Sequence, residues 1–135
     1  MNVLGIDIGD RYIGVAATDH SDAIAYRYAT IDRKSQDALQ ELQNIVKKES
    51  IERIIAGVPY HVEDGSETKQ TLKTKQFIID LRALLGDSVG VLEMDETLTS
   101  KEAKQTLSIE GADVSQEHAE AARLILQDFL IHGTY

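Results

Sequence analysis

One carboxylate inside an apolar stretch constrains the fold of this chain more than any other feature. Residues 3–8 are apolar except for Asp7, and a tight polar turn joins them to a second, largely apolar run at residues 12–18. This pattern predicts a β-hairpin. Burying a bare carboxylate in a sheet is costly unless a cation compensates its charge. The pattern therefore indicates a role for Asp7 beyond packing.

Two interpretations of Asp7 are open at this point. In the first, Asp7 caps the turn and Gly9 supplies a positive φ angle there. In the second, Asp7 is a metal or phosphate ligand at the end of a strand. Gly5 and Gly9 lie two residues away on either side of it, and they omit side chains where another backbone or a ligand comes close. We expect the second.

The composition limits the class of protein. The 135 residues suit a single domain, residues 1–135, with a core of its own. The absence of cysteine excludes disulfides and thiolate metal sites. The chain shows neither a basic leader nor an apolar run near the roughly 20 residues that span a bilayer. We therefore expect a cytoplasmic protein with no membrane partner.

The charge balance bears on nucleic acid as a partner. The net charge is −9, from 23 acidic and 14 basic residues. Loose electrostatic binding to nucleic acid relies on basic surfaces, so this balance counts against it. It does not exclude an enzyme in which divalent ions and a small basic patch meet the phosphates.

The hydrophobic periodicity predicts an α/β fold. Short or alternating apolar runs predict strands, and apolar residues at helical spacing predict helices. Strands are expected at residues 3–9, 12–18, 24–30, 53–58 and 89–94, and helices at 35–48, 67–85, 99–107 and 115–131. Three consecutive strands followed by two crossover units imply a five-stranded mixed sheet with helices on both faces. Asp7 is expected on its central strand.

Several local details accompany this prediction. Ser35, Thr99 and Ser115 are expected to cap the helices that they begin. In the helix at 67–85, which Gly86 is expected to end, the pattern predicts a buried seam, with Phe77, Leu81 and Leu84 beside it. The predicted seam consists of Leu72, Ile79 and Ala83.

Acidic residues from distant parts of the chain converge in this topology. The carboxyl ends of parallel strands are where α/β sheets bind ligands, and Asp7, Asp95 and Glu96 fall at such ends. Two divalent ions about 3.5–4 Å apart can deprotonate water and stabilise a departing oxyanion. Mg²⁺ and Mn²⁺ prefer carboxylate oxygens. The sequence therefore predicts a Mg²⁺ or Mn²⁺ site, with a two-metal arrangement suspected.

His118 is a candidate third ligand. It shares one helical face with two small alanines that would let the helix approach the sheet, Ala121 and Ala122, so its ring should point towards Asp7. A helix N-terminus disfavours imidazolium and leaves the neutral ring that a metal requires. Imidazole suits softer metals than Mg²⁺, which predicts better activity with Mn²⁺. The alternative is a hydrogen-bonded histidine near a helix start.

Six short motifs occur together in this chain. They are Gly5-Ile6-Asp7-Ile8-Gly9, Ile13-Gly14-Val15-Ala16, Gly57-Val58-Pro59, Asp64-Gly65-Ser66-Glu67, Asp95-Glu96-x-Leu98-Thr99 and Ala121-Ala122-x-x-Ile125-Leu126-Gln127. In this order and spacing they resemble the YqgF (RuvX) family of ribonuclease H-like proteins, also described as Holliday junction resolvase-like. The resemblance covers nearly the whole chain.

The resemblance implies a ribonuclease H-like fold and a metal-dependent endonuclease, a hydrolase of phosphodiester bonds. It implies processing of the 5′ end of the pre-16S ribosomal RNA, with cleavage of branched DNA at Holliday junctions as the alternative. By position, Asp7 would be the metal ligand of the first strand and Glu96 the acid after the last strand, both catalytic.

Three positions depart from the family's pattern. His118 stands where the family usually has an aspartate, Asp10 replaces a threonine, and Thr97 replaces an arginine. These departures remove one carboxylate and one cation and add an acid beside the site. They leave open a catalytically weakened descendant that only binds nucleic acid or protein.

The substrate surface is marked by a few residues. Lys69, Lys73 and Lys75 form the densest basic cluster, and Arg11 adds a charge beside the turn. These cations are candidates for phosphate contacts, or else a solvated helix face. Tyr60 is a candidate for stacking on an unpaired base, or else a residue that packs its loop.

Two further alternatives concern function and assembly. The actin and sugar-kinase fold opens with a similar Asp-x-Gly turn over ATP phosphates. It needs a second phosphate hairpin from a second domain, for which this chain is too short. The assembly is expected to be a monomer or a homodimer.

Overall fold

The computed structural model describes residues 2–19, 21, 23–96 and 116–132. The predicted helix at 99–107 with its Thr99 cap, the Ser115 cap and the departure at Thr97 lie outside these residues. The described elements are β1 (Asn2–Ile8), β2 (Tyr12–Thr18), β3 (Ala25–Asp32), α1 (Ala38–Glu49), β4 (Ile51–Val58), α2 (Lys69–Leu85), the 3₁₀ turn η1 (Gly86–Ser88), β5 (Gly90–Asp95) and α4 (Glu117–His132).

The strands form one mixed sheet, as predicted. Its order is β3-β2-β1-β4-β5, in a five-stranded sheet with β1 at the centre. The three strands from the start of the chain pair antiparallel, whereas β4 and β5 run parallel to β1. The central position predicted for the Asp7 strand is therefore confirmed, and it follows from hairpins on one side and crossover connections on the other.

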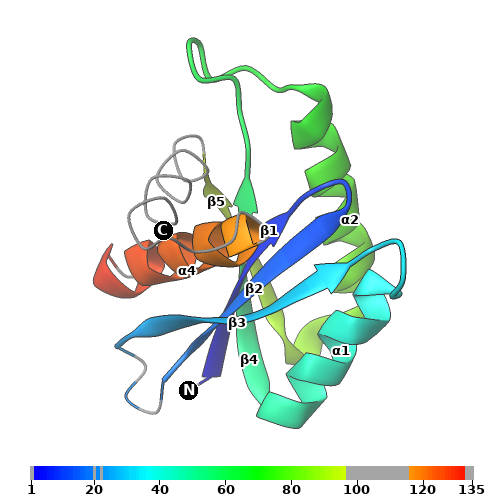
Figure 1. Cartoon of the computed structure of the whole chain (residues 1–135), viewed down its shortest axis with the longest axis vertical. Coiled ribbons are helices and arrows are strands. Elements are labelled where there is room, and N and C mark those ends of the chain that lie inside the picture. The colour runs from blue at the N-terminus through cyan, green and yellow to red at the C-terminus, as the bar shows by residue number, and fades with distance from the viewer. Residues whose placement is uncertain (1, 20, 22, 97–115, 133–135) are drawn as a thin grey trace.

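Helices cover both faces of this sheet (Figure 1). On one face, aliphatic side chains of β1 and β4 pack with α1 and α2 in the larger core cluster. On the other face α4 packs over a smaller cluster. No helix within the described ranges is both long and apolar enough to cross a membrane.

The first helix begins two residues later than predicted. Asp37, not Ser35, occupies the cap position, where its side chain accepts a hydrogen bond from the Gln40 amide at 3.3 Å. Ser35 instead closes a turn by donating its backbone N–H to the Asp32 carbonyl at 3.1 Å. Aspartate and serine are almost equally good caps, so the residue types do not distinguish these positions.

The second helix ends at the predicted glycine but buries a different face. Its seam was predicted at three residues that are in fact exposed, Leu72, Ile79 and Ala83. Leu84 is exposed too, and the buried residues are Thr71, Thr74, Phe77, Ile78 and Leu81. The Thr71 hydroxyl can be buried because it donates to the Pro59 carbonyl and bonds to the helix cap at Thr68.

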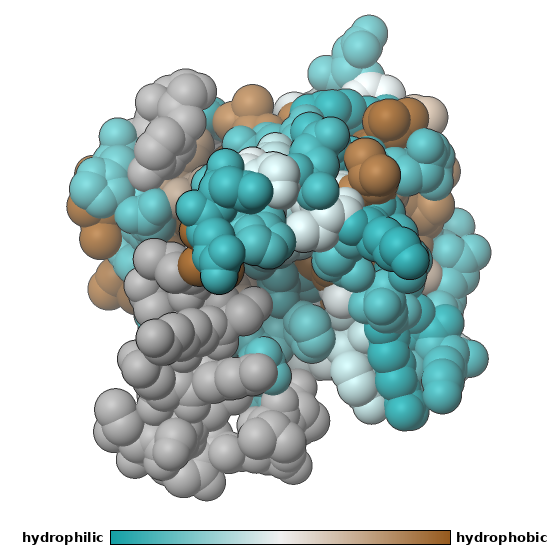
Figure 2. Space-filling view, turned by 90° about the horizontal axis from the view of Figure 1, so that it is seen from above, coloured by the Kyte–Doolittle hydropathy of each residue, from teal (hydrophilic) through white to brown (hydrophobic). Residues whose placement is uncertain are grey.

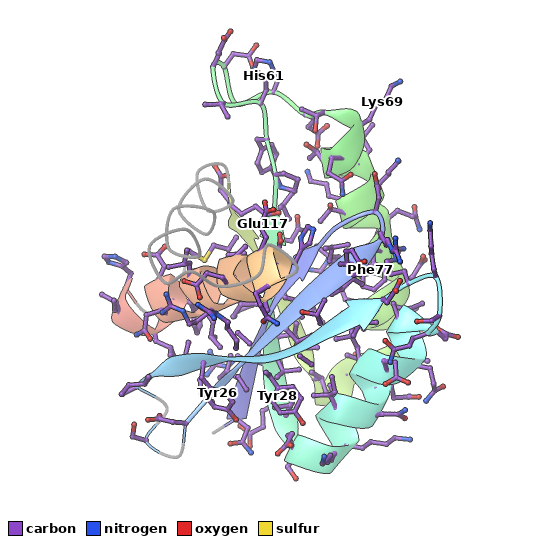
Figure 3. The ribbon with its side chains drawn as sticks, viewed as in Figure 1. Tyr26, Tyr28, His61, Lys69, Phe77 and Glu117 are labelled. Atoms are coloured by element: carbon purple, nitrogen blue, oxygen red, sulfur yellow. The ribbon has the colours of Figure 1, made fainter. Side chains whose placement is uncertain are left out.

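A projecting arm connects β4 to α2. Residues 61–66 are exposed and extend beyond the body of the molecule, with His61 near the tip (Figures 1 and 3). The arm folds back on itself through two hydrogen bonds of 2.8 Å, from the His61 amide to the Ser66 carbonyl and from the Gly65 amide to the His61 carbonyl. Gly65 has a φ of 71°, which favours glycine at this turn.

Candidate active site

Asp7 lies on the α4 face of the sheet, surrounded by glycines. Gly5 of β1 precedes it and Gly9, in the turn after β1, follows it, while Gly14 of β2 and Gly57 of β4 lie beside it in the strand register. The carboxylate is only 4% exposed. We call these four glycines the glycine floor. The sequence shows two of them, and only the register of the neighbouring strands brings in the other two.

The glycine floor allows α4 to lie directly on the strands. A Cβ atom at Gly14 would overlap the His118 carbonyl, and one at Gly5 would lie 2.8 Å from the Ala122 carbonyl oxygen. A Cβ at Gly9 would lie 2.6 Å from Cε1 of the His118 ring. The sequence attributes the close approach to the alanines of the helix. The structure shows that missing side chains on the sheet are equally necessary.

His118 projects from the first turn of α4 onto Asp7, as predicted. Its Nδ1 lies 2.7 Å from Oδ2 of Asp7. This hydrogen bond raises the pKa of His118, and partial burial opposes the rise. Gly9 lacks the positive φ that the turn-capping interpretation of Asp7 requires. The contact is compatible both with a site residue and with the alternative of a hydrogen-bonded histidine at a helix start.

Glu96 follows β5 directly and lies beside Asp7. Its backbone N–H donates to the Val58 carbonyl at 3.1 Å, which continues the pairing of β5 with β4. Its side chain is 5% exposed. Burial, a hydrogen bond with Asp7 and the negative charges of Asp7 and Asp95 raise the pKa of Glu96 to about 11. Burial of this carboxyl pair without a cation therefore disfavours the charge on Glu96.

The carboxyl pair fits a divalent cation. Oε2 of Glu96 is buried and has no hydrogen-bond partner within the described residues. A divalent ion would satisfy this oxygen and compensate both carboxylates, and oxygen ligands of this kind are what Mg²⁺ and Mn²⁺ prefer. Unsatisfied buried polar atoms are rare in folded proteins and usually mark a functional site or a missing ion.

Asp7 and Glu96 alone do not make a complete set of metal ligands. Within the ranges that the structure describes, no three His, Cys, Asp or Glu side chains are placed to hold an ion together. Nδ1 of His118 bonds to Asp7, and Asp95 ends β5 with an exposed side chain. The catalytic roles of Asp7, Glu96 and His118 remain predictions, as do the roles of these three residues and Asp95 as metal ligands.

Two of the predicted substrate residues, Arg11 and Lys73, pair with acids. Arg11 pairs with Asp32 at 3.4 Å. The hydrogen bond to Asp32 and the negative charge of Asp32 raise the pKa of Arg11. Lys73 lies 3.4 Å from Asp10. Both pairs are largely exposed and therefore contribute little to stability. They can be exchanged for phosphate contacts at low cost.

The remaining members of the basic cluster differ among themselves. Lys69 opens α2 with an exposed side chain (Figure 3). Lys75 pairs with Glu67 at 2.7 Å and lies 5.6 Å above the Tyr60 ring. Tyr60 itself packs half-buried against the larger core cluster, which favours the loop-packing alternative for this residue. Seen from above, the described surface is mainly hydrophilic (Figure 2).

Two side chains that sequence reasoning missed hold the end of β1. Arg33 donates to the Gly9 carbonyl at 2.8 Å, and Gln70 donates to the Ile8 carbonyl at 3.3 Å. They come from the β3–α1 connection and from α2, so they fix the backbone just beyond Asp7. No local pattern distinguishes them from other surface residues.

A buried ion-pair network, also missed, anchors α4. Glu120 is fully buried and accepts hydrogen bonds from Arg27 of β3 at 2.9 Å and from Arg123 at 2.6 and 2.7 Å. Burial disfavours its charge, but the two arginines outweigh this effect and lower the pKa of Glu120. The sequence signal for this network is Glu120 itself, a single acid on the predicted buried face of the last helix, two residues after His118.

Known sequences match this chain over nearly its whole length. The model of the family described as "RuvX: Holliday junction resolvase" matches residues 1–132. A protein of Caldanaerobacter subterraneus is 39% identical over 96% of both chains, and one of Syntrophus aciditrophicus is 36% identical over 96% of this chain and 88% of the relative. Both relatives carry the provisional name of a pre-16S rRNA nuclease.

Two solved structures with the same fold are Holliday junction resolvases. RuvC of T. thermophilus in complex with Holliday junction substrate superimposes with a TM-score of 0.60 at 15% identity, over 99% of this chain and 98% of that one. The Fowlpox virus resolvase with Holliday junction DNA gives 0.62 at 10% identity, over 98% of both chains. At these identities the likeness establishes the fold alone, and it confirms the predicted class.

Proposed function

This chain belongs to the RuvX family of Holliday junction resolvases, and from that membership we propose that it is a metal-dependent endonuclease that hydrolyses phosphodiester bonds beside Asp7 and Glu96. The observation that carries the proposal is the buried carboxyl pair, in which one Glu96 oxygen finds no hydrogen-bond partner among residues 2–19, 21, 23–96 and 116–132. A pair of this kind has no packing purpose, because two apolar residues of similar volume would stabilise the sheet better.

The residues of the site divide the work. Asp7 and Glu96 would hold divalent metal through their carboxylate oxygens, with His118 and Asp95 as further candidate ligands. When bound, such metal supplies an activated water and stabilises the departing oxygen. With Asp7 ionised, Nδ1–H of His118 donates to Oδ2 and fixes the orientation of that carboxylate. The glycine floor holds α4, and hence His118, against the strand.

For the substrate we propose the precursor of 16S ribosomal RNA. Support comes from the names of the two relatives, which are more than one third identical over nearly the full length. A substrate of this kind would place the protein in the cytoplasm. Branched DNA is the second candidate, and the description of the family model favours it. A descendant without nuclease activity is the third candidate, since His118 hydrogen-bonds to an Asp7 oxygen that would otherwise be available to metal.

Cleavage assays separate these candidates. Labelled 16S rRNA precursor and a four-way DNA junction are incubated with the protein in Mg²⁺, in Mn²⁺ and in EDTA. We expect metal-dependent cleavage of the RNA and its loss in Asp7→Asn. Asp87→Asn, which makes the same change in the exposed turn before β5, should retain activity. Cleavage of the junction alone would favour the second candidate. Failure to cleave either substrate in either metal would support the inactive descendant.

A further inference from the structure

A pocket of about 350 Å³ lies beside the end of β1, on the face of the sheet that α2 covers. It is formed by the β1–β2 turn, the start of the β3–α1 connection and the first three turns of α2. Its lining includes two cations, Arg33 and Lys73, two acids, Asp10 and Asp80, and the Phe77 ring. Ile8, the residue after Asp7, also lines it. The pocket and the carboxyl pair therefore lie at the same end of β1 but on opposite faces of the sheet.

Arg33 is the best-positioned cation of the pocket. Its Nη1 donates to the Gly9 carbonyl at 2.8 Å, and its guanidinium lies 5.2 Å from the centroid of the Phe77 ring. Figure 3 shows Phe77 on the side of α2 that faces the β1–β2 turn. A guanidinium held in this way loses little freedom on binding an anion, and its planar fork matches phosphate oxygens.

Lys73 supplies a second cation, and an acid partly neutralises it. Its Nζ lies 3.4 Å from Asp10, and both side chains are mostly exposed, at 63% and 70%. A pair at this distance in water contributes little. A phosphate group that Arg33 also binds would be a stronger partner for Lys73 than the Asp10 carboxylate, because both cations would hold it. Asp10 can turn away into solvent.

The start of α2 adds to the positive potential. The first turn of this helix contains no acidic residue, although acids are the favoured residues there. Lys69 and Lys73 lie in its first two turns instead. Cations at a helix N-terminus oppose the helix dipole, and a local arrangement that costs stability usually serves function. A bound anion would relieve this repulsion.

We propose that this pocket binds a backbone phosphate of the nucleic acid whose cleaved bond lies at Asp7 and Glu96, with Arg33 and Lys73 as the ligands of that phosphate. Asp10 competes with the phosphate for Lys73 and is displaced when the strand binds. This proposal rests on the proposed function for the path of the strand, but what it predicts is phosphate binding and not cleavage.

Binding without cleavage tests the proposal. The affinity of the protein for a short labelled single-stranded RNA, and for the four-way DNA junction, is measured in EDTA over a series of salt concentrations. Each phosphate contact contributes about 0.7 to the slope of log affinity against log salt for a single strand and about 0.9 for a duplex. Lys73→Gln and Arg33→Gln should each lower the slope by about this amount. Lys48→Gln, at the exposed end of α1, should leave it unchanged.

Two further variants guard the interpretation. Arg33→Lys keeps the charge and should keep the slope, which separates phosphate binding from support of the Gly9 carbonyl. Asp10→Asn should strengthen binding severalfold at low salt, and Asp87→Asn, with the same change in net charge, should do so much less. Equal effects of Lys73→Gln and Lys48→Gln, or of Asp10→Asn and Asp87→Asn, would overturn the proposal.

The outcomes also distinguish this proposal from the proposed function. A protein that binds with the expected slopes but never cleaves refutes the nuclease and leaves the phosphate site standing. A protein that cleaves while Arg33→Gln and Lys73→Gln keep the unmodified slopes refutes the phosphate site alone. Absence of any nucleic-acid binding overturns both.

Discussion

The two faces of β1 follow different rules. Towards α1 and α2 the strand presents buried aliphatic side chains such as Ile6 and Ile8, and towards α4 it presents Gly5, Asp7 and Gly9. The first face stabilises the fold through apolar area removed from water. The α4 face buries less apolar side-chain area, but it allows the helix to contact the strand backbone and it holds a buried acid. Within one strand, alternation separates stability from chemistry.

The largest expected effect on stability lies on the aliphatic face. Ile6→Ala removes a fully buried side chain from beneath α1 and α2 and should lower the free energy of unfolding by about 2–5 kcal/mol. Below its melting temperature, the variant should cleave at close to the unmodified rate. Urea unfolding and cleavage assays check the two halves. A folded Ile6→Ala protein without activity would contradict the claim that one face of β1 provides stability and the other the chemistry.

The next effect lies on the glycine floor and should affect both properties. Gly14→Ala places a methyl group where the His118 carbonyl lies, so α4 must move away from the strand. We expect a loss of about 1–3 kcal/mol in the free energy of unfolding together with loss of cleavage, because His118 leaves Asp7.

The matched control for this change is Gly90→Ala. A Cβ at Gly90 meets only Cγ of Arg53, at 3.7 Å. This variant should keep its activity and its stability to within about 1 kcal/mol. If Gly14→Ala behaves like Gly90→Ala, the close contact of α4 does not hold the site.

A smaller effect concerns the anchor of α4. Glu120→Gln keeps the shape of the side chain but removes the charge that Arg27 and Arg123 face, and should cost about 1–2 kcal/mol. Asp128→Asn, in an exposed pair with His132, should cost less than about 1 kcal/mol. Because the pKa of Glu120 is lowered in the fold, its contribution is present above about pH 4.5 and is lost as the pH falls through its folded pKa. Thermal melts from pH 7 to 3 should show this loss in the unmodified protein and not in Glu120→Gln.

The smallest effect is a change in metal preference. His118→Asp replaces an imidazole by a hard oxygen ligand at the place nearest Asp7, and should raise cleavage in Mg²⁺ severalfold relative to Mn²⁺. His118→Ala serves as the control for simple loss of the ring. If both variants cleave at the unmodified rate in both metals, His118 is only a residue of the helix start.

Much of this architecture can be predicted from the sequence because its signals are local. The order of strands and helices follows from periodicity, and the central place of Asp7 follows from connection rules. The orientation of His118 follows from its helical spacing to Ala121 and Ala122, since residues on one helical face point the same way. In each case neighbours along the chain carry the information.

The errors and omissions have a common physical cause, which is pairing between distant segments. The buried face of α2 contains Thr71 and Thr74 because their hydroxyls find partners, including the Pro59 carbonyl, and hydropathy cannot anticipate a satisfied hydroxyl. Gly14 and Gly57 join the site only through strand register. The contact of Arg33 with Gly9 likewise spans two connections.

The most direct test of the central claim is metal binding by the carboxyl pair, measured as thermal stability in a titration with Mn²⁺. At 100 times the dissociation constant, an ion bound only by the folded protein adds about 2.7 kcal/mol. The unmodified protein should be stabilised, and Asp7→Asn and Glu96→Gln should each lose that gain. Equal stabilisation of all three proteins, or none in the unmodified protein, would contradict a metal site at Asp7 and Glu96.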